Sequence, residues 1–217
     1  MLLLAAVALQ AGGGASSGSL NVELRDVPAP PSADASLDST AWGPPQVTIA
    51  TRSGTASVWL LRAADSVFVV ARVPDRTPSW ADAVSLCLDV SGDRAVAPAH
   101  DDFQFTLRRV LDSSVVYRGR NGRWQPPLDD PDWRVGAAHA GGGWEAEAVS
   151  DAAGWSLVLR LDPAWFAGEA GRRPALAVIL HNDDPSSWSA WPSRQDGSLP
   201  QDLDQAPSGW AVVQLPT

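Results

Sequence analysis

The sequence of 217 residues contains a single cysteine and no lysine, so all 16 of its basic residues are arginines. One cysteine excludes an internal disulfide. The 25 acidic residues leave a formal net charge of -9, which makes a continuous basic face for a nucleic-acid backbone hard to assemble. No internal apolar run reaches the length of a membrane span. These absences predict a globular domain that neither binds nucleic acid nor inserts into a membrane.

Sequence motifs that anchor catalysis are also missing. The sequence contains no HExxH, GxSxG, P-loop or dinucleotide fingerprint, and His100, His139 and His181 lack zinc-ligand spacing. Glu145 with Glu147, or the pairs of adjacent Asp residues, are candidate glycosidase acids, but adjacent acids on a strand point to opposite faces and the sequence does not show that any two carboxylates converge on a cleft. Cys87 stands in an apolar run, which indicates a buried thiol rather than a nucleophile. We therefore predict that the chain is not an enzyme.

The first eleven residues, MLLLAAVALQA, form a short apolar segment that runs into small residues, as is typical of a secretory signal peptide. We expect cleavage near Ala11 or Ala15 and an exported protein, periplasmic or extracellular. The Gly/Ser-rich and Pro-rich stretches that follow predict a flexible spacer. The expected organisation is a signal peptide at 1–15, a flexible N-terminal segment at 16–36 and one folded domain at 37–217.

The body of the chain carries strand signals rather than helix signals. Nine runs rich in Val, Leu and Trp have strand length, with turn signals between them: 56–61, 67–73, 84–90, 103–110, 114–118, 144–149, 155–161, 175–181 and 210–215. Phe103 and Phe105 alternate with polar residues, so one face of that strand is buried while Gln104 faces solvent or ligand. We predict an all-β, two-sheet antiparallel β-sandwich of jelly-roll or immunoglobulin-like type.

One segment has the signature of a helix start. Asp162 is a favourable N-cap residue, and Pro163 is favourable at the first helical position. We therefore expect one short helix at 162–166, closing an end of the sandwich.

Eleven tryptophans against four phenylalanines and one tyrosine form an unusual aromatic balance, because Phe or Leu would fill a core equally well. An indole offers a flat apolar face to the CH groups of a sugar ring, while polar neighbours bind the hydroxyls. Five tryptophans fall in expected strands or the short helix and should be core residues: Trp59, Trp144, Trp155, Trp165 and Trp210. Trp80, Trp188 and Trp191 stand in Pro/Ser-rich segments expected to be loops, where they either contact a ligand or anchor the loop.

Several segments keep a characteristic order along the chain: LDSTAW at 37–42, TASVWLL at 55–61, WADAVSLCLD at 80–89, DDFQF at 101–105 and HNDD at 181–184. Together they resemble carbohydrate-binding module family 9, over roughly residues 37–215. The resemblance implies a two-sheet β-sandwich, structural calcium and a sugar held between two Trp side chains. Trp80 matches the first of these tryptophans. The second is missing at 199–205, unless Trp188 or Trp191 replaces it.

Polar residues near these positions complete a predicted ligand site and a predicted metal site. The ligand site comprises Trp80, Trp188, Trp191, Asn182, Asp183 and Gln104, whose amide and carboxylate groups would bind sugar hydroxyls. The metal site comprises the hard oxygen donors of Asp89, Asp93, Asp101 and Asp102. The EF-hand spacing is absent, so a structural calcium and solvated loop acids are both open.

The leading prediction for function is non-catalytic binding of a glycan or small sugar through loop tryptophans. One alternative is a structural or protein-interaction module of the cell envelope that has lost the sugar site. Others are an accessory domain associated with glycoside hydrolysis, a free-standing glycoside hydrolase and a haem-binding sandwich with His ligands. The sequence does not indicate an oligomeric state.

Overall fold

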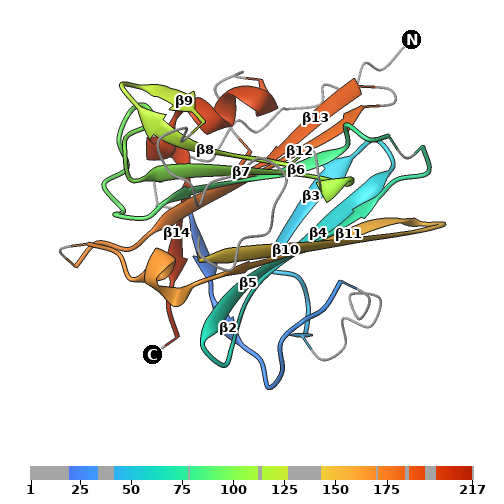
Figure 1. The fold of residues 1–217 in the computed structure, drawn as a ribbon, viewed down its shortest axis with the longest axis horizontal. Helices are drawn as coiled ribbons and strands as arrows, with labels where there is room; N and C mark the ends of the chain where they lie inside the picture. Colours follow the sequence, from blue (N-terminus) through green and yellow to red (C-terminus); the bar gives the residue numbers. More distant parts are fainter. Residues whose placement is uncertain are drawn as a thin grey trace, which may run out of the picture.

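The computed structural model describes residues 20–33, 42–77, 79–111, 114–126, 143–169, 171–183, 186–193 and 199–216, and in it two β-sheets face each other (Figure 1). The eight-stranded sheet runs in the order β1 (Asn21–Glu23), β14 (Ala211–Gln214), β12 (Ala175–Asp183), β6 (Ala83–Asp89), β7 (Asp102–Arg108), β8 (Val115–Arg120) and β9 (Arg123–Gln125), with β13 (Ser186–Trp191) paired to β12. The six-stranded sheet runs β10 (Trp144–Asp151), β11 (Gly154–Leu161), β5 (Ser66–Pro74), β4 (Gly54–Ala63) and β2 (Arg25–Asp26), with β3 (Val47–Thr51) paired to β4. The predicted sandwich is confirmed.

All nine expected strands are present, with ends that differ by a few residues. The turn between β8 and β9 shows why such signals work. Asn121 and Gly122 have φ values of 53° and 75°, the left-handed conformation that a tight two-residue hairpin requires. The sheets are not purely antiparallel, however, because β1 pairs with β14 and β2 pairs with β4 in parallel.

The main core lies between the two sheets. Alternate residues of β6, among them Leu86 and Leu88, point inward, and Leu157 and Leu159 of β11 belong to the same cluster. Burying one such leucine contributes about 1.5–3 kcal/mol. Trp59, Trp144, Trp155 and Trp210 are at most 5% exposed, so the prediction that they are core residues is confirmed. The loops are therefore carried by a well-packed scaffold.

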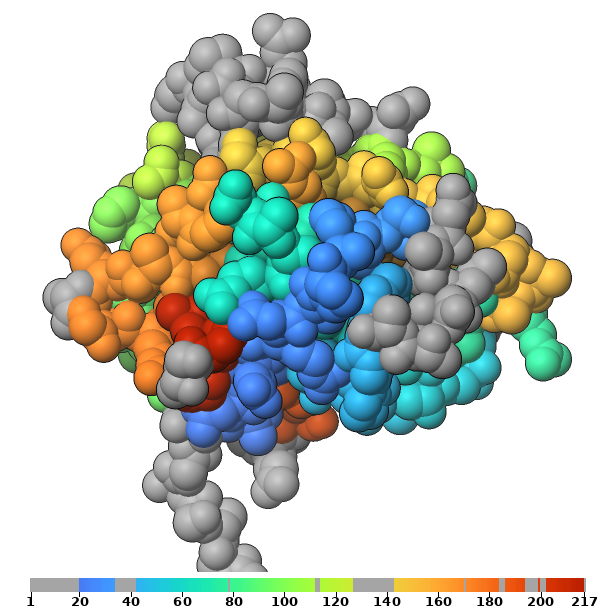
Figure 2. Space-filling model, turned by 90° about the horizontal axis from the view of Figure 1, so that it is seen from below, coloured from blue at the N-terminus to red at the C-terminus, as the bar shows by residue number. Residues whose placement is uncertain are grey.

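The N-terminal segment before residue 37 is not a flexible spacer over residues 20–33, and that expectation is wrong there. Val22 and Leu24 are buried in the main core. Farther along, Ala33 packs on the outer face of the six-stranded sheet, in a second cluster with Trp42 and Trp59. Figure 2 shows this segment, in blue, spread across the molecule. The three-residue strand β1 contains a single apolar residue, which produces too weak a periodicity for the sequence to reveal it.

The segment after residue 199 covers part of the outer face of the eight-stranded sheet. Leu203 and Trp210 pack there against Cys87, and the Trp210 ring stacks on Trp124 with centroids 6.4 Å apart. This segment forms two further 3-10 helices, η5 (Pro200–Gln205) and η6 (Pro207–Gly209), so the expectation of a single short helix is wrong. Burial of the Cys87 thiol is confirmed.

The expected helix is present as the 3-10 helix η4 (Pro163–Phe166). The Asp162 carboxylate caps it by accepting a hydrogen bond from the Ala164 N–H at 2.8 Å. Trp165 packs edge-on against Phe103, with ring centroids 4.6 Å apart. In the part of the chain that the structure describes, no helix combines the length and apolar character needed to cross a membrane.

Candidate functional site

Trp80 lies between β5 and β6 and is the most exposed tryptophan that the structure describes, at 65%. The Arg108 guanidinium, at the end of β7, lies over the indole with its carbon 5.2 Å from the ring centroid. The loop expected from the Pro/Ser-rich sequence around Trp80 is confirmed. The indole presents an apolar face to solvent beside a guanidinium with five N–H donors.

Strand register aligns four residues across the eight-stranded sheet. Trp188 of β13 is opposite His181 of β12, His181 is opposite Ala83 of β6, and Ala83 is opposite Arg108 of β7. Directly opposed residues share one face, here the outer face, because the alternate residues of β6 and β7 point into the main core. The small Ala83 lies between two larger side chains. We call Trp80, Ala83, Arg108, His181 and Trp188 the indole surface.

Trp188 is held against the histidine. Its ring stacks on His181 with centroids 4.2 Å apart and an interplanar angle of 21°, while 41% of the residue stays exposed. The expectation that Trp188 and Trp191 lie in a loop is wrong, since both belong to β13. Serines are typical of loops, but an edge strand such as β13 also tolerates them on its solvent face.

Trp191 does not join this surface. It lies three positions after Trp188, so the alternation of a strand places it on the opposite face. There it is partly buried against the main core and opposite Val178. Its predicted role in ligand contact has no geometric support.

The polar residues of the predicted ligand site lie in different places. Asp183 borders the indole surface, and its carboxylate accepts a hydrogen bond from the Ser79 hydroxyl at 2.7 Å. Asn182 hydrogen-bonds the buried Asp75 side chain instead. Gln104 is only 8% exposed and donates to the Asp204 carboxylate at 3.1 Å, so its amide is already used within the protein. Of these three, only Asp183 is placed to meet a ligand beside Trp80.

Buried acids that the sequence did not reveal hold the Trp80 loop, defined as residues 79–82. Asp82 is 1% exposed, and its carboxylate accepts the Ser79 N–H at 2.7 Å and the Asp183 N–H at 3.0 Å. Arg109 lies 3.5 Å from the carboxylate of Asp75 and 3.7 Å from that of Asp82. Burial raises the pKa of Asp82, although the two N–H donors oppose it. The one sequence signal for Asp82 is its position two residues after the exposed Trp80.

The pKa of Asp75 moves the other way. Burial acts to raise it, but hydrogen bonds from the Thr77 backbone and from Asp82 outweigh burial, and the pKa of Asp75 is lowered. The pKa values of the two neighbouring acids thus shift in opposite directions, and both carboxyl groups face the Arg109 guanidinium.

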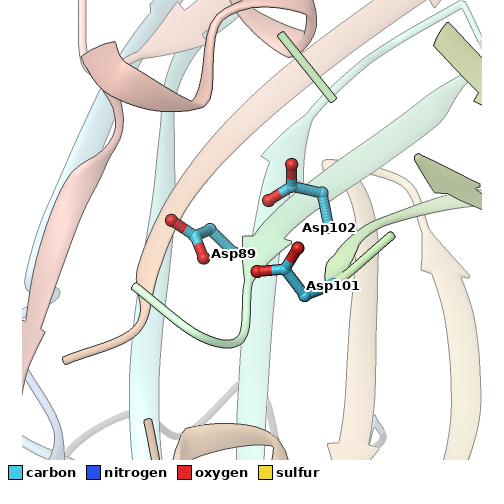
Figure 3. Close-up of side chains that lie close together, drawn as sticks. All are labelled: Asp89, Asp101 and Asp102. Atoms are coloured by element: carbon cyan, nitrogen blue, oxygen red, sulfur yellow. The ribbon is translucent and has the colours of Figure 1, made fainter. Parts of the chain in front are cut away.

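A separate acidic cluster lies where β6 ends and β7 begins. Carboxylate oxygens of Asp89, Asp101 and Asp102 lie within 4.8 Å of one another (Figure 3). Asp93, the fourth predicted ligand, is exposed and outside this cluster, and its carboxylate accepts the Ala95 N–H at 2.9 Å. Three of the four predicted metal ligands thus converge.

The chemistry of this cluster fits a divalent cation with oxygen ligands. Oδ2 of Asp101 and Oδ1 of Asp102 are buried and have no hydrogen-bond partner among the described residues. Burial raises the pKa of Asp102 to about 8, and burial also raises the pKa of Asp89. The loop that follows Asp89 turns at Gly92, where φ is 71° and a Cβ would lie 2.1 Å from the Arg173 carbonyl oxygen, so only glycine fits. Unpaired, buried carboxylate oxygens are the atoms that Ca²⁺ would bind.

Two concave pockets lie elsewhere on the molecule. One, of about 180 Å³, is lined by Asp65, Ser66, Gly143, Trp144, Glu145, Arg160 and Asp162. Its Arg160 already pairs with Glu145 at 3.0 Å. The other is an open hollow along residues 95–100 and 120–122. Neither of these two pockets is lined by Trp80 or Trp188.

No protein-family model and no curated protein matches the sequence. Solved structures do resemble the fold. A carbohydrate binding module family 9 from Caldicellulosiruptor kristjanssonii in complex with glucose aligns with a TM-score of 0.53 and 14% identity, covering 90% of this chain and 95% of that one. A module of the same description and organism in complex with cellotriose gives 0.52 and 14%, covering 90% and 92%. The predicted resemblance is confirmed at the level of the fold, which is that of carbohydrate-binding module family 9.

Proposed function

We propose that the chain is a non-catalytic carbohydrate-binding module whose ligand lies on the indole surface. The observation that carries this proposal is the placement of the exposed Trp80 and Trp188, 108 positions apart in sequence, on one face with polar side chains beside them. Packing does not explain two exposed indoles at one sheet end. CH groups of a pyranose ring would lie on their apolar faces.

The polar groups around the indoles suit a neutral, hydroxyl-rich ligand. The Arg108 guanidinium supplies N–H donors, and its Nε has no hydrogen-bond partner among the described residues. The Asp183 carboxylate supplies acceptors from the other side. A donor and an acceptor of opposite charge can bind adjacent hydroxyls without leaving a net charge at the surface. The neighbours with the same fold were solved with glucose and cellotriose, which supports glucose-type ligands.

Calorimetric titration with glucose, cellotriose and a panel of other oligosaccharides tests the proposal. We expect Trp80→Ala to weaken binding of the tightest-binding sugar by about 2 kcal/mol, because a stacked aromatic side chain is typical of a binding hot spot. Val96→Ala is the matched control, since Val96 is 86% exposed and lies away from the indole surface. Equal affinity of wild type and Trp80→Ala would refute this site.

One feature favours the alternative of an envelope interaction module without a sugar site. Residues 199–205 contain no aromatic side chain where the family resemblance places a second stacking tryptophan. Trp188 reaches the indole surface from β13 instead, and the proposal depends on its serving in that place. If no glycan of the panel binds, the interaction module becomes the better account.

We also propose that Asp89, Asp101 and Asp102 hold a structural calcium ion and that the chain is exported. The unpartnered oxygens of Asp101 and Asp102 support the metal. A bound Ca²⁺ would neutralise carboxylates that otherwise repel one another. Export rests on the apolar leader at 1–15, which lies outside the described residues.

A further inference from the structure

The two indoles of the surface are connected through one side chain. His181 contacts the Trp80 loop on one side and the Trp188 ring on the other. Its Nδ1 lies 3.2 Å from the Ala81 carbonyl oxygen. Because a carbonyl oxygen only accepts hydrogen bonds, Nδ1 carries the hydrogen and donates it. Nε2 lies 3.3 Å from the Ser186 hydroxyl, so both ring nitrogens are used within the protein.

The attachment of the Trp80 loop to β12 is concentrated at the residues that flank Trp80. Ser79 bonds the Asp183 carboxylate, Asp82 accepts the Asp183 N–H, and Ala81 accepts from His181. Trp80 itself contributes its ring to the surface, whereas its position is set by these neighbours. Of the three attachments, only the one through His181 also contacts Trp188.

We infer that His181 is the positioning residue of the indole surface, an inference that rests on the proposed function. Its N–H holds the Trp80 loop and its ring face holds Trp188, so one imidazole fixes the relative placement of both indoles before a sugar arrives. A preorganised surface does not have to be ordered when the ligand binds, which raises affinity without any new contact to the ligand. His181 therefore acts on binding by positioning the two tryptophans.

Two substitutions separate the two contacts of the imidazole. His181→Asn keeps an N–H donor near the position of Nδ1 but removes the ring that stacks on Trp188. His181→Phe keeps an aromatic ring but removes the donor to Ala81. Each variant is the matched control of the other, because each retains the contact that the other loses.

NMR of the ligand-free full chain reports on both contacts of His181, the one with Ala81 and the one with Trp188. In His181→Phe we expect the backbone amides of Ser79, Ala81 and Asp82 to exchange with solvent roughly tenfold faster, because the loop opens more often. In His181→Asn those amides should stay protected. The indole N–H resonance of Trp188, assigned with Trp188→Phe, should shift in His181→Asn and change little in His181→Phe.

A double-mutant cycle on sugar affinity distinguishes positioning of Trp188 by His181 from a general effect of His181 on stability. If Trp188→Ala lowers the sugar affinity of the wild type roughly tenfold, it should lower the affinity little further in the His181→Asn background, because the Trp188 indole is already misplaced there. Additive losses, or unchanged amide exchange and indole resonance in both variants, would overturn the inference. A wild type that binds no glycan but shows the expected NMR changes would refute the proposed function and leave the positioning by His181 intact.

Discussion

The carboxylate of Asp82 accepts a hydrogen bond from the backbone N–H of Asp183 at 3.0 Å, across 101 positions of sequence. The same carboxylate accepts the Ser79 N–H, so one buried acid joins the Trp80 loop to the strand that faces Trp188. The indole surface is thus built on a buried polar network and not on loop packing alone. Such networks are costly to break, because each partner left behind is buried without a hydrogen bond.

Replacing Asp82 by alanine should therefore destabilise the protein severely. The substitution leaves two N–H groups unpaired and removes one of the carboxylates that face Arg109, and we expect a loss of about 3–5 kcal/mol in the free energy of unfolding. Urea unfolding measures the loss. Asp26→Ala, which breaks only the exposed ion pair with Arg62, should have little effect. Similar midpoints for both variants would contradict the network.

The folded role of the N-terminal segment can be tested at one leucine. Leu24 is 1% exposed, and Leu24→Ala should lower the free energy of unfolding by about 2–4 kcal/mol through lost burial and a residual cavity. Leu20 is 47% exposed, and Leu20→Ala should stay within about 0.5 kcal/mol of the wild type. Denaturant unfolding compares the two. Equal, small effects would mean that residues 20–26 do not belong to the fold.

Calcium should stabilise the protein through the acidic cluster. At a calcium concentration 100 times the dissociation constant, we expect a gain of about 2.7 kcal/mol, which raises Tm by about 5–10 °C. Asp102→Asn should abolish the gain, because it removes a charged ligand from the cluster. Asp93→Asn, outside the cluster, should retain it. Calorimetric scans with calcium and with chelator measure the change in Tm. A Tm that is the same in both conditions would exclude the metal site.

The same cluster predicts how stability changes with pH when a chelator removes metal ions. The pKa of Asp102 is raised to about 8 in the folded protein, so the folded state binds its proton more tightly than the unfolded chain does. This contribution is fully present below the unfolded pKa of about 4 and is lost as pH rises toward 8. The pKa of Asp89 is also raised, so its contribution to stability is likewise lost as pH rises.

Calcium should remove this loss, because it binds the deprotonated carboxylates. Stabilisation by calcium is therefore expected to grow between pH 4 and pH 8, and chemical unfolding with calcium or EDTA at several pH values measures it. Other acids with shifted pKa values, such as Asp75 and Asp82, contribute equally with and without calcium and cancel in the difference. A difference independent of pH would contradict the raised pKa at the cluster.

Much of the sandwich could be predicted because strands and their turns are local features. The alternation around Phe103 and Phe105 predicted β7, and the turn signal at Asn121-Gly122 marks the end of the predicted strand β8, although β9 after it was not predicted. Short or serine-rich strands escaped, as β1 and β13 show, because they lack a long apolar period. The predicted functions of Gln104 and Trp191 failed to gain support for a different reason. Whether a residue on a sheet face meets solvent depends on what covers that face.

From its amino-acid order alone, this protein is determined to be a strand-rich domain with indoles in its core, because side-chain period and apolar content act over a few neighbouring residues. Only the tertiary structure decided that Trp188, His181, Ala83 and Arg108 share one row and that the Asp82 carboxylate is buried. That row depends on the register between strands about 100 positions apart. A shift of one residue would turn those side chains to the other face, and the local sequence does not specify which strands pair.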